Sequence, residues 1–219
     1  MAGPAQLVET LSLVTGVPHA TIVDIDRKLV KGGLRTKGGR GLHAAQMTPL
    51  DAARLLTAVL ASTQANAAAE AVARYGQTRV DKARSSDTLY NEARLDDLSS
   101  LPPGHSYVDA LAALIASVCD GALAKLISKA DGEWLPNIEV FAFTRATRGR
   151  IRVSGLPNGL TASVEYALTG RARLSSRKIA ASRSSTSADE PLGDLEQSRR
   201  VTEATILAIA KLLAESPHE

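Results

Sequence analysis

The spacing of apolar residues changes from helical to alternating along this chain of 219 residues. Up to about residue 75, apolar positions recur every three or four residues, as on one face of a helix. From residue 137 onward, the runs NIEVFAFT, RIRVSG and TASVEYALT are instead rich in β-branched and aromatic residues. The turn sequences RATRGR and LPNG separate them. The pattern predicts an α+β fold, mainly helical, with a small antiparallel three-stranded sheet.

Two helices are expected before residue 32, over residues 5–15 and 18–31, joined by the short turn TGVP. Gly16 is expected to end the first helix and Gly32 the second. In the second helix the apolar residues fall on one face, with basic residues mostly on the opposite face. The apolar set is Ile22, Ile25 and Leu29, and the opposite set is Ala20, Asp24, Arg27, Lys28 and Lys31.

A third helix is predicted to begin after Thr48, which is expected to be its N-cap. Pro49 then takes the first helical position, and Asp51 is the acidic partner three residues after the cap. We expect this helix to run on through the alanine-rich segment to about residue 73.

A basic stretch rich in glycine, LRTKGGRG, lies between the second and third helices. It contains three cations, Arg35, Lys37 and Arg40, and no acidic residue occurs from Gly32 to Thr48. Glycines allow the backbone to approach a phosphate closely, and the cations can then contact phosphates or a minor groove. The order of helix, turn, helix and basic ribbon is that of a helix-turn-helix followed by a wing.

The segment TGVPHATIVDIDRKLVKGGL, with RTKGGRG and MTPLDAARLL after it, resembles a winged helix-turn-helix domain of the MerR-like kind. The layout is also similar to that of DNA-binding proteins encoded by phages or prophages. The resemblance covers about a quarter of the chain. It departs from the MerR-like pattern at the helix exit and wing, which lack the usual aromatic residues, so the coupling to a metal or drug sensor is not carried over.

Five parts of the chain are expected. They are a winged helix-turn-helix DNA-binding domain (1–75), a linker (76–105), a helix with a β-meander for oligomerisation (106–170), a flexible basic linker (171–192) and a C-terminal amphipathic helix (193–219). The linker at 76–105 includes a possible short helix at Leu89–Leu95, and a long apolar helix is expected over residues 106–130. The apolar stripe of the terminal helix is expected to be Leu195, Ile206, Ile209 and Leu213.

The residues expected to contact DNA are the basic and polar ones on the second helix, the ribbon and the hairpin at residues 145–152. They are His19, Thr21, Arg27, Lys28, Lys31, Arg35, Lys37, Arg40, Arg148 and Arg150. Alternatives stay open for each group. The helix cations can form an ordinary solvated face, His19 and His43 can be surface residues without a role, and the hairpin arginines can pair with Glu139 and Glu165 across the sheet.

Composition and motif searches argue against several other functions. A net charge of +3 does not by itself indicate nucleic-acid binding, and an aromatic content of 3% argues against stacking on single strands. No phosphate-binding loop, nucleophile elbow or metal-ligand spacing occurs, so we expect no enzyme activity, cofactor or metal. Cys119 is the sole cysteine, and we see neither a signal peptide nor a membrane span, so we expect a cytoplasmic protein.

The sequence therefore predicts binding to a specific double-stranded DNA sequence by a homo-oligomer, a dimer or larger, that regulates transcription. One alternative is a phage DNA-packaging recognition subunit, because small terminase proteins resemble this plan of N-terminal helix-turn-helix, central oligomerisation region and C-terminal tail. The other is a protein-interaction module with no role at DNA.

Overall fold

The computed structural model describes residues 2–37, 45–86, 98, 100–128, 136–144, 147–156, 160–168 and 197–214. Several expectations fall on other parts of the chain and lie outside the described residues. These are Arg40 and His43 of the ribbon, the helix at Leu89–Leu95, the linker at 171–192, and Leu195.

The N-terminal helices begin and end largely where the sequence indicates. Helix α1 spans Pro4–Thr15 and ends at Gly16, whose φ of 69° places it in the left-handed region that suits glycine. Helix α2 spans His19–Lys31 and follows after a short turn. Helix α3 spans Pro49–Ala61, and the predicted Thr48 cap with its Asp51 partner is confirmed.

The alanine-rich helix expected to reach residue 73 is divided, which corrects the prediction. Helix α3 ends at Ser62, a 3-10 turn η2 covers Ala65–Ala67, and helix α4 spans Ala68–Tyr75. Ser62 has an extended backbone and its hydroxyl donates to the carbonyl of Ala58. The polar residues after Ala61 thus compete with the helix for backbone hydrogen bonds, as serine and threonine commonly do.

Within the described residues the sheet is antiparallel and has five strands in the order β1-β4-β3-β2-β5, so the α+β class is confirmed but the count of three is wrong. The three predicted runs form the centre of the sheet, and two short strands flank them. The strands are β1 (Thr78–Val80), β2 (Asn137–Phe143), β3 (Arg148–Leu156), β4 (Leu160–Leu168) and β5 (Ser198–Thr202).

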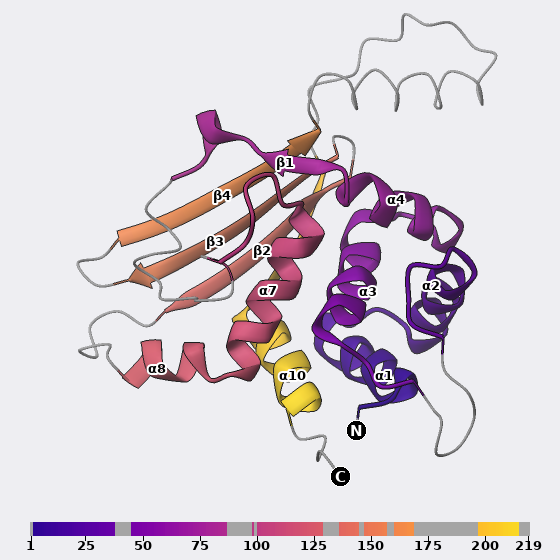
Figure 1. The fold of residues 1–219 in the computed structure, drawn as a ribbon. Helices are drawn as coiled ribbons and strands as arrows, with labels where there is room; N and C mark the ends of the chain where they lie inside the picture. Colours follow the sequence, from indigo (N-terminus) through magenta and orange to yellow (C-terminus); the bar gives the residue numbers. More distant parts are fainter. Residues whose placement is uncertain are drawn as a thin grey trace, which may run out of the picture.

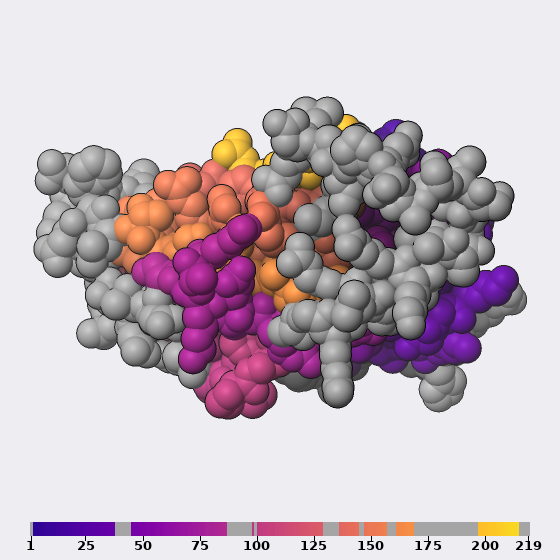
Figure 2. Space-filling view, turned by 90° about the horizontal axis from the view of Figure 1, so that it is seen from above, coloured from indigo at the N-terminus to yellow at the C-terminus, as the bar shows by residue number. Residues whose placement is uncertain are grey.

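Both additional strands lie in segments for which another structure was expected. Strand β1 falls within the expected linker at 76–105 and pairs with β4. Strand β5 falls within the expected C-terminal helix and pairs with β2. Seen from above (Figure 2), β1 and the 3-10 turn η3 (Lys82–Arg84) lie at the surface beside β4. Each strand is short and polar, so neither shows the alternation that marks a strand in sequence.

The long helix expected over residues 106–130 is bent. Helix α7 spans Tyr107–Cys119 and helix α8 spans Ala122–Ser128, with 63° between their axes. Gly121 has a φ of 80°, which ends α7 and allows the chain to turn. The C-terminal helix α10 spans Glu203–Ala214 and buries Ile206 and Ile209 as expected.

Helices α7 and α10 lie over one face of the sheet, and α1 to α4 group beside them (Figure 1). A single hydrophobic core includes residues from all of these helices and from the inner face of the sheet. Tyr107 of α7 packs on β3 where Gly149 stands, because a Cβ there would lie 2.2 Å from the tyrosine ring. The core therefore runs across the expected boundary between the N-terminal helices and the sheet.

Candidate nucleic-acid interface

Helix α2 exposes the residues expected of a helix that docks on DNA. Its apolar residues Ile22, Ile25 and Leu29 are buried against the rest of the protein. His19 and Thr21, at its N-terminal end, are exposed, as recognition helices present the residues that reach base edges. The cations of the same helix are also accessible. Arg27 and Lys31 are exposed, and Lys28 is half-buried.

Arg35 lies against the protein instead of projecting toward a ligand, which corrects the prediction for this residue. Its Nε lies 2.6 Å from Oδ1 of Asp26, and its Nη2 donates to Oδ2 of the same carboxylate at 2.9 Å. The arginine side chain is only 10% exposed. A bidentate pair of this kind fixes both side chains. No sequence pattern indicates this pair, because Asp26 is on the inward face of α2 and nine residues away.

The pair nevertheless favours a positive outer face on α2. Asp26 is buried, and its carboxylate forms an ion pair with Arg35. The cations Arg27 and Lys31 on the outer face are therefore not matched by that carboxylate. Asp24, which is half-buried, remains as an acidic residue of the same helix face.

The two ends of the basic ribbon are tied to one carboxylate. Asp51 of α3 accepts hydrogen bonds from the backbone N–H of Thr36 at 2.9 Å and from its hydroxyl at 3.1 Å. The same carboxylate accepts from the N–H of Thr48 at 3.2 Å and from its hydroxyl at 2.8 Å. Asp51 thus caps α3 and also joins the residues that precede and follow the segment at 38–44.

These hydrogen bonds affect the ionisation of Asp51. Burial raises the pKa of this carboxyl, but the donors of Thr36 and Thr48 outweigh burial and bring the pKa below its ordinary value of 3.8. The carboxylate is therefore charged at neutral pH. Lys37, the last described residue before the segment at 38–44, is exposed.

The two hairpin arginines expected to extend the interface are held within the sheet. Nη2 of Arg150 donates to Oε1 of Glu165 at 2.9 Å, and Nε of Arg148 lies 3.3 Å from the same oxygen. Arg148 also stacks over the ring of Phe143, at 4.4 Å from the centroid. The alternative of pairing across the sheet is thus confirmed, and Arg148 and Arg150 are withdrawn from the candidate interface.

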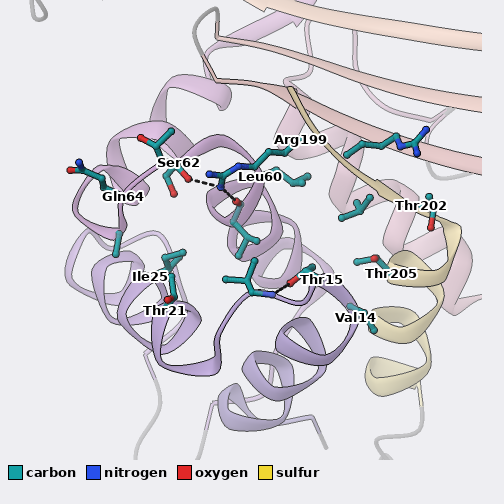
Figure 3. A pocket seen from close by; sticks show the side chains of 16 residues that line it. Val14, Thr15, Thr21, Ile25, Leu60, Ser62, Gln64, Arg199, Thr202 and Thr205 are labelled. Atoms are coloured by element: carbon teal, nitrogen blue, oxygen red, sulfur yellow. Dashed lines mark hydrogen bonds between the residues drawn. The ribbon is translucent and has the colours of Figure 1, made fainter. Parts of the chain in front are cut away.

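Sequence reasoning missed a cavity of about 590 Å³ that lies beside α2. Its walls come from α1, α2, the end of α3, β5 and the start of α10, which are far apart in sequence (Figure 3). Thr21 and Ile25 of α2 belong to its lining. No periodicity in the sequence brings these segments together, so no local signal could have indicated the cavity.

Comparisons of the chain with protein-family models, curated proteins and solved structures found no match. Across the part of the chain described here, no three His, Cys, Asp or Glu side chains are grouped so as to hold a metal ion. None of the described helices is by itself both long and apolar enough to cross a membrane, and only the bent pair α7 and α8 would suffice in length and composition.

Proposed function

We propose that the protein binds double-stranded DNA through α2 and the basic ribbon that follows it, and that it acts in the cytoplasm as an oligomeric regulator of transcription. The observation that carries the proposal is the exposed face of α2. It presents Arg27 and Lys31, while the opposite face is buried in the core. His19 and Thr21 are also exposed, on different sides of the first turn of the helix.

The arrangement of the flanking elements supports this proposal. Helix α1 packs on α2 after a three-residue turn, as the bracing helix of a helix-turn-helix does. The ribbon leaves the end of α2, and hydrogen bonds to Asp51 hold Thr36 and Thr48, which flank the segment at 38–44, at the start of α3. Lys37 is exposed, and the proposal assigns phosphate contacts to it and to Arg40, which lies outside the described residues.

The acidic residue Asp24 stands against a purely electrostatic role for α2. A carboxylate near the phosphates would weaken binding, whereas it can accept a hydrogen bond from the N4 amino group of cytosine. The proposal therefore assigns phosphate contacts to Arg27, Lys31 and the ribbon, and a base contact to Asp24. Sequence preference is then expected in addition to general affinity for DNA.

The first experiment is a selection of bound sequences from random duplexes, followed by anisotropy titrations with the selected duplex. We expect Arg27→Ala combined with Lys31→Ala to weaken binding by at least about tenfold at moderate salt. The matched control is Lys82→Ala combined with Lys125→Ala, which removes the same charge from exposed positions on η3 and α8. Equal affinities of the two double variants would count against the proposed face.

The assembly of the protein separates the regulator from the packaging subunit. A dimer or tetramer would place two copies of α2 on half-sites one or more helical turns apart, as for a regulator. A ring of eight or more subunits would instead favour DNA packaging. The mass measured by light scattering distinguishes the two assemblies. Duplex binding no stronger than that of an unrelated protein of similar charge would favour the interaction module.

A further inference from the structure

The cavity beside α2 has the size and setting of a ligand site. Its volume of about 590 Å³ falls within the range of roughly 300 to 1,000 Å³ that small-molecule sites usually have. Figure 3 shows Thr21 and Ile25 on one side, Val14 and Thr205 on the other, and Arg199 reaching across from β5 toward the end of α3.

The lining combines an apolar floor with hydroxyl groups. Ile25, Val59 and Leu60 are buried and provide apolar surface. Threonine side chains from α1, α2 and α10 supply groups that donate and accept hydrogen bonds. None of the described residues that line the cavity is an aspartate or a glutamate. A cationic occupant would therefore find no counter-charge, whereas a neutral or anionic molecule with an apolar body matches the surface.

Arg199 decides between a neutral and an anionic occupant. Its Nη1 donates to the carbonyl oxygens of Val59 at 2.9 Å and of Ser62 at 2.8 Å. These contacts cap the C-terminal end of α3 and hold the guanidinium at the cavity wall. Carbonyl oxygens do not cancel a full charge, and no described carboxylate forms an ion pair with Arg199. Its Nε and Nη2 make no hydrogen bond to another described residue.

The neighbouring residue Arg200 differs from Arg199 in having a carboxylate partner. Arg200 also belongs to the lining, but it lies on the other face of β5, where its Nη1 donates to Oε1 of Glu139 at 2.6 Å. Its charge is therefore matched within the sheet. Of the two arginines of β5, Arg199 is the one without a carboxylate partner among the described residues, and its side chain borders the cavity.

We propose that this cavity binds a small organic anion, with its apolar body on Ile25, Val59 and Leu60 and its acidic headgroup on Arg199. The site goes beyond the proposed function and does not depend on it. Because Thr21 and Ile25 belong to α2, an occupant would also contact the helix that we propose docks on DNA. The same chain would then carry an effector site next to its DNA-binding face.

The test uses two dyes that differ only in the anionic group. They are 8-anilinonaphthalene-1-sulfonate and its uncharged parent, N-phenyl-1-naphthylamine. Each dye is titrated against the full chain without DNA, and binding is measured by its fluorescence. We expect one saturable site for the sulfonate on each chain. Arg199→Gln is expected to weaken the sulfonate at least about tenfold and the uncharged dye less than about twofold. Arg199→Lys, which keeps the charge, is expected to restore most of the affinity.

Two further variants complete the design. Arg79→Gln is the matched control, because Nη1 of Arg79 also donates to two backbone carbonyls, those of Gly76 and Thr78, away from the cavity. It is expected to leave both affinities unchanged. Thr63→Phe adds bulk at the cavity rim without removing the cap of α3 and should weaken both dyes.

Three results would overturn the proposal. One is the absence of saturable sulfonate binding by the wild-type chain. Another is full sulfonate affinity in an Arg199→Gln variant whose circular dichroism spectrum is that of the wild type. The third is full sulfonate affinity in Thr63→Phe, which decides the matter if Arg199→Gln fails to fold.

Discussion

Replacing Asp51 by alanine tests whether one carboxylate both caps α3 and ties the ends of the ribbon. The residue is 2% exposed and accepts four hydrogen bonds, two from Thr36 and two from Thr48. Loss of an N-cap interaction costs about 1 kcal/mol of stability. Hydrogen bonds to a charged group contribute about 1.5–3 kcal/mol each, but water can replace the carboxylate at the exposed residues Thr36 and Thr48. We therefore expect a total loss of about 2–3 kcal/mol.

The chain contains a matched control for this substitution. Asp109 forms the same capping box at the start of α7, where it accepts from the N–H and the hydroxyl of Ser106. Asp109 accepts no hydrogen bond from a second segment among the described residues, so Asp109→Ala should cost only the cap, about 1 kcal/mol. Asp109 is exposed whereas Asp51 is buried, so the difference between the two variants reports the hydrogen bonds from Thr36 together with the deeper burial of Asp51. Urea unfolding followed by circular dichroism measures both free energies of unfolding.

The pKa of Asp51 gives the same prediction a pH dependence. Because the pKa is lower in the folded than in the unfolded protein, the carboxylate stabilises the fold fully above the unfolded value, near 3.8. The contribution declines as the pH falls through the lower folded value. The wild type and Asp51→Ala should therefore differ most above about pH 5 and converge in strong acid. Equal costs for Asp51→Ala and Asp109→Ala, or a difference independent of pH, would refute the reasoning.

Three further predictions concern the core and the ribbon. Gly149→Ala should destabilise the protein by about 1–3 kcal/mol in thermal unfolding, because the added Cβ would lie 2.2 Å from Tyr107; an unchanged stability would contradict this packing. Tyr75→Phe should cost about 1–2 kcal/mol in urea unfolding, since its hydroxyl bonds to the carbonyls of Phe143 and Arg148, and an unchanged stability would show these bonds to be unimportant. Lys37→Ala combined with Arg40→Ala should weaken duplex binding at moderate salt by at least about tenfold in an anisotropy titration, and unchanged affinity would remove the ribbon from the interface.

The features that the sequence predicts well are those encoded by neighbouring residues. The Thr48 and Asp51 cap, the left-handed Gly16 and the three central strands each depend on a few consecutive side chains. Features of this kind appear in the structure as predicted, because the groups that form them are neighbours in the chain.

The features that sequence reasoning missed depend on partners far away in the chain. Strand β5 exists because β2 offers it a free edge, although its residues SRRVT do not alternate in polarity. Arg35 has no acidic neighbour in the sequence around it, but the folded chain places Asp26 of α2 within ion-pair distance. Arg199 caps a helix that ends 137 residues before it. Tertiary contacts decide these positions, and a periodicity in sequence cannot report them.

The salt dependence of duplex binding tests the central claim most directly. Each phosphate contact contributes about −0.9 to the slope of log affinity against log salt concentration. Removing Arg27 and Lys31 together should therefore make the slope shallower by about 1.8, while the Lys82 and Lys125 control keeps the wild-type slope. If the slope and affinity of the α2 variant equal those of the wild type, the exposed face of α2 does not contact DNA.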